Sequence, residues 1–84
     1  GTGSPLREFI YSDDIARLTM FALDNYEGEE PLILSNVVET SIRDLVESIA
    51  ELMNFKGKIV WDSSKPNGQE RKPSDNSPLK TLIN

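Results

Sequence analysis

The clearest pattern in the chain is a helical repeat of apolar side chains between residues 42 and 53. These side chains occupy the i, i+3, i+4, i+7, i+8 and i+11 positions, beginning at Ile42 and ending at Met53. This spacing places all of them on one face of a helix. The run Ser41-Ile42-Arg43-Asp44 resembles a capping box with Asp in place of Glu or Gln, which predicts Ser41 as the N-cap.

A second helical repeat predicts a helix over residues 13–26. Its apolar positions are Ile15, Leu18, Phe21, Ala22 and Tyr26. Ser12 is predicted to cap this helix, and Asp13 and Asp14 lie in its first turn, where the helix dipole favours negative charge. A last short helix is predicted after Ser77, which would cap it, with Pro78 at its first position.

Three short runs rich in apolar residues predict strands at residues 9–11, 32–36 and 58–62. In the first, alternation places Phe9 and Tyr11 on one face and Ile10 on the other. The unbroken apolar run at 32–34 is typical of a strand that is covered on both faces. Strands that alternate with helices predict a two-layer fold of the α/β class, α+β-like in this short chain. Three strands that need cover leave too little chain for a closed core, so we expect part of a larger domain.

Composition excludes several kinds of site. The 84 residues contain no Cys and no His, so a disulfide or a thiolate ligand is excluded, and a zinc site or a His-based triad would need residues from elsewhere. No metal site is predicted. No apolar run approaches the roughly 20 residues of a membrane span, and no signal peptide is visible, so we expect a cytoplasmic protein that binds no membrane.

Charge is unevenly distributed along the chain, whose net charge is −5. Residues 63–80 contain four basic and two acidic side chains, whereas the rest contains five basic and twelve acidic ones. The acidic balance argues against nucleic-acid binding. A basic loop on an acidic body favours a discrete anionic ligand over a polyanion.

The opening stretch, Gly1-Thr2-Gly3-Ser4-Pro5-Leu6-Arg7, places one arginine between a glycine-rich turn and a predicted strand. A guanidinium fixed in this way can bind a planar anion such as phosphate through two parallel hydrogen bonds. The alternative is a surface ion pair of Arg7, for instance with Glu8 or Asp14.

A polar loop of thirteen residues is predicted at positions 63–75. Pro66-Asn67-Gly68 predicts a tight turn, because Asn and Gly both tolerate positive φ. Loops of this length are usually functional or disordered. Its candidate ligand-binding residues are Lys65, Asn67, Arg71 and Lys72. The alternative is a solvated loop without a ligand.

The machinery of a dehydrogenase is not found in this sequence. Gly1-x-Gly3 is followed by Leu6 and not by a third glycine, and a dinucleotide-binding motif requires a strand before it. Tyr11 and Tyr26 are followed four positions later by Ile15 and Glu30, so neither has the lysine that would lower a catalytic tyrosine pKa. We therefore predict no catalytic residue in the chain, and no activity for the 84 residues alone.

The motif G-x-G-x-x-x-R-x-F-x-Y-x-x-D at residues 1–14 resembles the extended short-chain dehydrogenase/reductases that act on nucleotide sugars. The fuller opening run, together with E-P-L-I-L-S, S-I-R-D-L and K-P-N-G through N-S-P-L-K, resembles the GDP-L-fucose synthase family. That family comprises NADP-dependent epimerase/reductases that convert GDP-4-keto-6-deoxy-D-mannose to GDP-L-fucose. The resemblance implies that residues 1–84 form part of the C-terminal substrate-binding domain of a homodimeric enzyme. NADP would be bound by a nucleotide-binding domain upstream, and not by this chain.

The resemblance also implies roles for the candidate residues. The family's arginine at the position of Arg7 contacts the nucleotide diphosphate of the GDP-sugar. Asn67 stands where the family has an Asp that contacts substrate, so a hydrogen bond could survive there but a charge-dependent contact could not. Arg71 and Lys72 match a basic pair that could neutralise phosphate, and Lys65 opens the same loop. Trp61 is interpreted as a core residue, with stacking on guanine as the alternative.

Two other functions stay open at this stage. One is the substrate lobe of another nucleotide-sugar epimerase/reductase that uses a UDP- or dTDP-sugar. The other is a non-catalytic interaction module in which the helix over residues 42–54 binds a partner.

Overall fold

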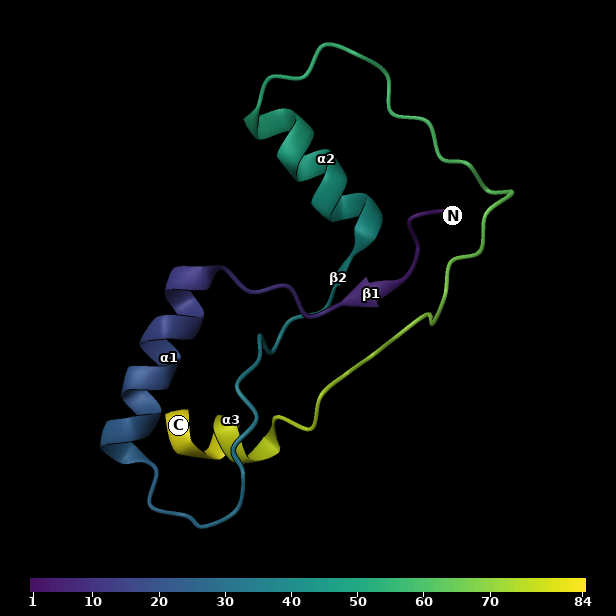
Figure 1. The fold of residues 1–84 in the computed structure, drawn as a ribbon. Helices are drawn as coiled ribbons and strands as arrows, with labels where there is room; N and C mark the ends of the chain where they lie inside the picture. The colour runs from purple at the N-terminus through teal and green to yellow at the C-terminus, as the bar shows by residue number, and fades with distance from the viewer. The chain divides into compact units, whose positions relative to one another are not determined.

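The computed structural model describes all residues from Gly1 to Asn84. Its elements are, in order, β1 (Leu6–Arg7), α1 (Ser12–Asn25), β2 (Thr40–Ser41), α2 (Ile42–Leu52) and α3 (Ser77–Ile83) (Figure 1). Helices combined with a small antiparallel sheet confirm the expected mixed class. The chain divides into two compact units, each built from two separate stretches. Unit 1 comprises Gly1–Arg7 and Glu39–Lys72, and unit 2 comprises Glu8–Val38 and Pro73–Asn84.

Unit 1 is organised around the two residues of β1. Strand β1 pairs antiparallel with β2, so that Leu6 lies opposite Ser41 and Arg7 lies opposite Thr40. On its other side, Leu6 forms a parallel bridge with Arg71, and its N–H donates to the carbonyl of Glu70 at 2.7 Å. The opening stretch therefore lies between β2 and the end of the basic loop.

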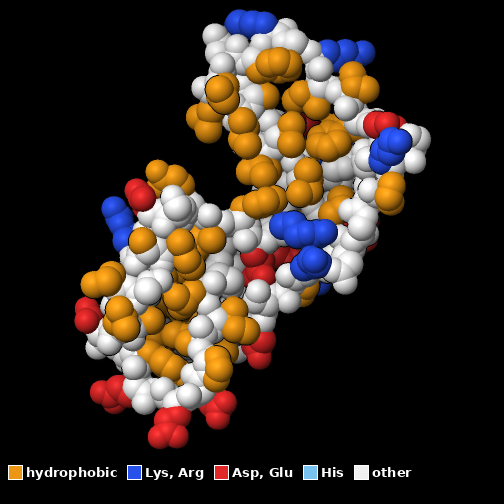
Figure 2. Space-filling model, viewed as in Figure 1, with side chains coloured by type: hydrophobic (Ala, Val, Ile, Leu, Met, Phe, Trp, Pro, Cys, Tyr) orange, Lys and Arg blue, Asp and Glu red, His pale blue; other side chains and the backbone are white.

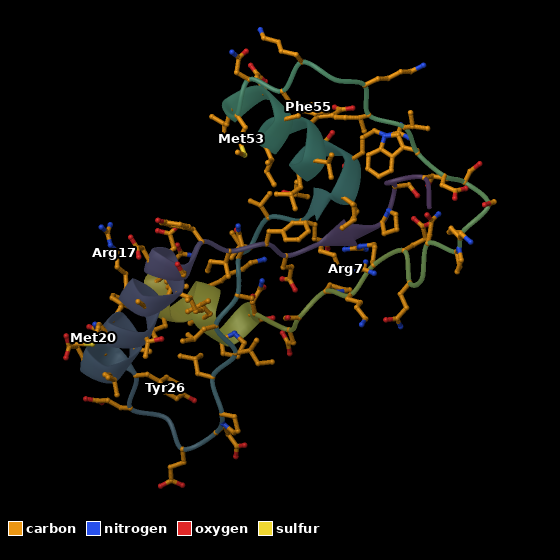
Figure 3. All side chains as sticks on the ribbon, turned by 45° about the horizontal axis from the view of Figure 1, so that its top comes forward. Arg7, Arg17, Met20, Tyr26, Met53 and Phe55 are labelled. Atoms are coloured by element: carbon orange, nitrogen blue, oxygen red, sulfur yellow. The ribbon has the colours of Figure 1, made fainter.

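Helix α2 follows β2 directly and begins as the sequence predicts. The Ser41 hydroxyl accepts a hydrogen bond from the Asp44 N–H at 3.0 Å, which confirms Ser41 as the N-cap. The apolar face is less covered than expected, because α2 has no buried residue and Met53 is 76% exposed. Figure 2 shows hydrophobic side chains gathered over this part of unit 1, and Figure 3 shows Met53 and Phe55 near the end of α2.

Unit 2 contains α1 and α3, and both helices begin one residue earlier than predicted. Tyr11 is the N-cap of α1: its carbonyl accepts from the N–H groups of Asp14 and Ile15, and Ser12 is already helical. Asn76 is the N-cap of α3 in the same way. The predicted caps Ser12 and Ser77 are therefore wrong, because each serine lies inside the first turn.

The small core of unit 2 lies at α3. Leu79 is the one large hydrophobic side chain that is fully buried, at 1% exposure. Three residues before Leu79, the buried Asn76 amide donates to the Glu8 carboxylate at 3.4 Å and to the Ser35 hydroxyl at 3.3 Å. The same carboxylate accepts from the N–H of Ser74 at 2.7 Å. These bonds join the two stretches of unit 2.

The strands predicted at residues 9–11, 32–36 and 58–62 are wrong. The chain contains a single two-stranded sheet, β1–β2, and none of the three apolar runs pairs in it. A strand needs a hydrogen-bonded neighbour as well as apolar side chains, and these runs have none within the 84 residues. The first two runs are joined instead by the Asn36 amide, which donates to the Phe9 carbonyl at 2.7 Å.

Two properties of the molecule concern membranes and metal ions. None of the helices has the length and apolarity needed to cross a membrane. No group of three or more acidic, His or Cys side chains is arranged to hold a metal ion.

Candidate anion-binding site

Arg7 is held at a fixed point of unit 1 by the pairing of β1. Its side chain is half-buried, and its guanidinium donates to the carbonyl of the preceding Leu6 at 2.7 Å. The one ion pair of the structure joins Arg71 and Glu39, so Arg7 has no carboxylate partner. The surface ion pair considered for Arg7 is therefore not formed, and most of its five donors remain for a ligand. Figure 3 shows Arg7 on the β1 ribbon.

Asn67 fastens the basic loop to the glycine-rich opening. Its side-chain oxygen accepts from the Thr2 N–H at 2.7 Å, and its amide nitrogen donates to the Thr2 hydroxyl at 3.1 Å. Because a side-chain amide has two N–H groups, one donor of Asn67 remains for a ligand. The half-buried Asn67 thus has a structural role that the sequence did not indicate.

A small hollow lies where these two segments meet. It measures about 180 Å³ and is lined by Gly1, Gly3, Pro5, Ile42, Trp61, Pro66 and Asn67. Gly3 has a φ of +81°, and a Cβ there would lie 2.8 Å from the Trp61 ring. Arg43 lies over the same ring, 5.5 Å from its centroid, and donates to the Thr2 carbonyl at 2.6 Å. Trp61 is half-buried and packs within unit 1, consistent with a structural role.

Arg71 is engaged by an acid. Its guanidinium donates through Nε to Glu39 Oε2 at 2.8 Å and through Nη2 to Glu39 Oε1, which is a bidentate pair. The Arg71 hydrogen bonds lower the pKa of Glu39 below its ordinary value, which favours the ionised carboxylate. The same pair raises the pKa of Arg71. Two nitrogens of the Arg71 guanidinium, Nε and Nη2, are therefore already hydrogen-bonded to Glu39 and do not face a ligand.

Lys65 and Lys72 are exposed cations on the same loop, and neither takes part in an ion pair. Lys65 is the last residue of a tight turn over residues 62–65, which its N–H closes by donating to the Asp62 carbonyl at 3.3 Å. The Asp62 carboxylate accepts from the hydroxyl and the N–H of Ser64, which lowers the pKa of Asp62. Lys72 directly follows Arg71, the residue that pairs with Leu6. Unit 1 therefore contains Arg7, Asn67 and all three loop cations of the sequence prediction.

Glu39 and Thr2 are the residues of this site that the sequence analysis did not single out. An acid is not an expected neighbour of an anion site, and Glu39 lies 32 positions before its partner Arg71. Thr2 looks like an ordinary turn residue. No local pattern marks either residue, because both act through contacts between distant stretches.

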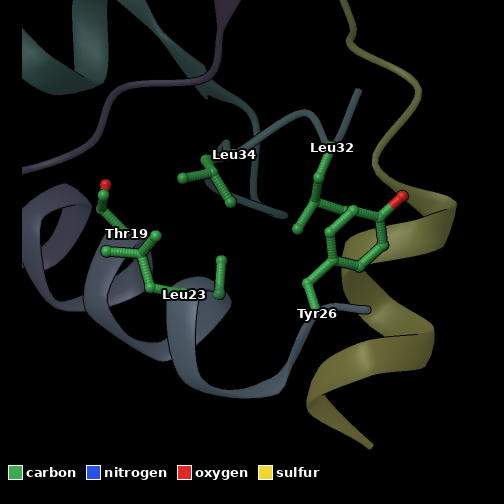
Figure 4. Close-up of a pocket in the computed structure, with 6 residues that line it drawn as sticks. Thr19, Leu23, Tyr26, Leu32 and Leu34 are labelled. Atoms are coloured by element: carbon green, nitrogen blue, oxygen red, sulfur yellow. The ribbon is translucent and has the colours of Figure 1, made fainter. Parts of the chain in front are cut away.

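Unit 2 contains a larger pocket, of about 280 Å³, which does not suit an anion. Figure 4 shows its lining of Thr19, Ala22, Leu23, Tyr26, Leu32 and Leu34. None of these side chains is charged. Its two hydroxyl groups are already used, since Thr19 donates to the Ile15 carbonyl and Tyr26 donates to the Glu30 carbonyl.

The residues at hand do not fit NADP. A dinucleotide site needs a strand, a glycine turn and a helix in that order. Here the glycines precede β1, and the next helix, α1, begins only at Ser12 in the other unit. We therefore assign no NADP contact to this chain.

Comparison with known proteins identifies the relatives of the chain. No protein-family model matches it. It is 46% identical over 82 residues to the putative GDP-L-fucose synthase 2 of Arabidopsis thaliana, and 49% identical over 85 residues to the GDP-L-fucose synthase of Dictyostelium discoideum. These alignments cover 98% and 99% of the chain, but only 25% and 27% of the two relatives.

A solved structure agrees with the sequence comparison. The crystal structure of a GDP-L-fucose synthetase from Naegleria fowleri bound to NADP matches with a TM-score of 0.88 and 40% identity. The match covers 98% of this chain and 26% of that protein. The chain spans about a quarter of the length of the relatives that it matches. Over nearly all of its residues, the chain is homologous to one segment of the GDP-L-fucose synthase family.

Proposed function

We propose that this chain is the GDP-sugar-binding segment of an NADP-dependent epimerase/reductase that converts GDP-4-keto-6-deoxy-D-mannose to GDP-L-fucose. In this proposal it forms part of the C-terminal substrate-binding domain. Another domain of the enzyme binds NADP and supplies the catalytic groups. The proposal includes the cytoplasmic location expected from the sequence and the homodimeric state that the family resemblance implies.

The observation that carries the proposal is the bridge between Leu6 and Arg71. This bridge brings the strand that presents Arg7 next to the end of the basic loop. Two stretches more than sixty positions apart thereby contribute to one small sheet. A guanidinium on a strand beside a loop that carries lysines suits the two adjacent charges of a diphosphate.

Each candidate residue has a distinct part in the proposed site. Arg7 binds the diphosphate through two parallel hydrogen bonds, while Lys65 and Lys72 supply further positive charge. Asn67 offers its remaining N–H to the nucleotide, and Arg71 belongs to the site through the loop that it holds. Fixing the GDP portion orients the sugar for reaction elsewhere in the enzyme, which lowers the entropic part of the barrier.

The test uses a full-length host enzyme, the Dictyostelium synthase, in which this chain replaces the segment that aligns with it over 85 residues. Arg7→Ala in this host should raise KM for the GDP-sugar well above tenfold, because a charge-assisted bidentate contact contributes about 2–3 kcal/mol. The matched control is Arg17→Ala, which removes an exposed arginine from α1 in unit 2. The measurement is steady-state kinetics on both variants.

An unchanged KM for Arg7→Ala would remove Arg7 from the site and contradict the proposal. Competition with GDP, UDP and dTDP identifies the nucleotide. Inhibition by GDP alone supports a GDP-sugar, and stronger inhibition by UDP or dTDP shows that the segment serves another nucleotide sugar.

A further inference from the structure

Glu39 is an acidic side chain placed inside a site that is proposed to bind an anion. It directly precedes β2, and Thr40 of β2 pairs with Arg7. Its side chain is only 20% exposed, whereas that of its partner Arg71 is 60% exposed. A carboxylate in this position would repel a diphosphate, so its presence needs a reason.

The geometry of the ion pair supplies that reason. Leu6 lies between Ser41 on one side and Arg71 on the other. The Glu39–Arg71 pair therefore links the strand β2 to the end of the basic loop, across the strand that carries Arg7. Both carboxylate oxygens are engaged, and a bidentate pair fixes direction as well as distance.

The backbone holds this end of the loop at few points. The bridge between Leu6 and Arg71 is isolated, and the loop's other anchors to the opening stretch lie at Asn67 and Glu70. The Glu70 side chain contacts Ser4 only at 3.3 and 3.5 Å. The bidentate pair is the one hydrogen-bonded contact of the Arg71 side chain, and Lys72 follows Arg71 directly in the sequence.

We infer that Glu39 is a positioning residue of the anion site, which holds Arg71 as a structural support and keeps the basic loop beside Arg7. This inference rests on the proposed function. Arg71 then belongs to the framework of the site, and Arg7 and Lys72 meet the charge of the diphosphate. Glu39 contributes to binding although its own charge opposes the ligand.

The test uses the fact that Glu39 and the diphosphate are both negatively charged. In the host enzyme, Glu39→Gln should raise KM for the GDP-sugar by about tenfold and leave kcat nearly unchanged, because the loop cations lose their position. Simple electrostatics predicts the reverse, since removal of a carboxylate should favour an anion. Glu70→Gln is the matched control, because it also removes one negative charge from unit 1, here from the basic loop itself, and leaves the Glu39–Arg71 pair intact. It should leave KM unchanged or lower it.

A charge-exchange variant separates a supporting role of Arg71 from direct binding. Arg71→Glu alone should raise KM at least as much as Glu39→Gln. The double variant Glu39→Arg, Arg71→Glu rebuilds the pair in reverse and should return KM to within about threefold of the host value. If KM stays as high as in Arg71→Glu, Arg71 binds the ligand itself and the inference is wrong.

Two further outcomes are decisive. An unchanged or lower KM for Glu39→Gln overturns the inference, provided that thermal melting shows a folded host enzyme. If that variant does not fold, the comparison of the double variant with Arg71→Glu decides the matter. Failure of the proposed function is recognised separately, because only that failure leaves KM unchanged in Arg7→Ala.

Discussion

The two units differ in what holds them together. Unit 1 relies on polar contacts between distant stretches: the strand pair, the Asn67–Thr2 bonds and the Glu39–Arg71 pair. Unit 2 contains the one large hydrophobic side chain that is fully buried, Leu79, and a polar cluster around Asn76. The candidate residues all lie in unit 1. The candidate site is therefore built where hydrogen bonds and charges set the geometry, and the main apolar anchor lies in the other unit.

The largest expected effect separates stability from binding. Leu79→Ala in the host enzyme should lower the free energy of unfolding by about 2–5 kcal/mol, because it leaves a cavity at a fully buried site. KM for the GDP-sugar should stay unchanged. The measurements are thermal melting and steady-state kinetics, with Leu52→Ala as the control because Leu52 is 86% exposed. A large rise in KM for Leu79→Ala would show that the division of roles is wrong.

The next effect compares two glycines of unit 1 that both have positive φ. Gly3→Ala and Gly68→Ala should each cost about 1–2 kcal/mol of backbone strain. Gly3→Ala should cost more, since its Cβ would lie 2.8 Å from Trp61 and 2.9 Å from Arg43, whereas nothing lies within 4 Å of a Cβ at Gly68. Only Gly3→Ala should also raise KM, because the displaced stretch leads to Arg7. Equal melting temperatures for the two variants would contradict this packing.

The smallest effect compares a serine that caps a helix with one that does not. Ser41→Ala should destabilise α2 by about 1 kcal/mol, because the Asp44 N–H loses its acceptor. Ser12→Ala should have little effect, since Ser12 lies in the first turn of α1 and Tyr11 is the N-cap. Thermal melting of both variants in the host enzyme measures the difference. A loss at Ser12 that equals the loss at Ser41 would contradict the observed start of α1.

Local patterns predicted the helices well. The repeats at 13–26 and 42–53 correspond to α1 and α2, and the cap at Ser41 is confirmed. Helices follow from local spacing, since their hydrogen bonds join residues four positions apart. Strands depend on distant partners, so the apolar runs at 9–11, 32–36 and 58–62 gave wrong predictions. The actual strands are two residues long and too short to leave an alternating pattern.

The candidate site was predictable in part for the same reason. Arg7 and the loop cations were marked by charge and by turn residues, and the structure places them in one unit. Their binding of a ligand stays a prediction. The support that Glu39 and Thr2 provide was not predictable, because each acts on a residue at least 32 positions away. Motifs indicate which side chains are candidates, and long-range contacts determine how those side chains are held.

The chain passes between the two units three times, since each unit is built from separated stretches. This connectivity sets an order of events during synthesis on the ribosome. The first seven residues must wait for the stretch that ends at Lys72, and unit 1 can then close before Pro73–Asn84 has been made. Helix α1 is synthesised before α3, the other helix of unit 2. During translation, unit 1 with its candidate anion-binding residues can therefore form while α1, with its apolar side chains, still lacks the other helix of its unit.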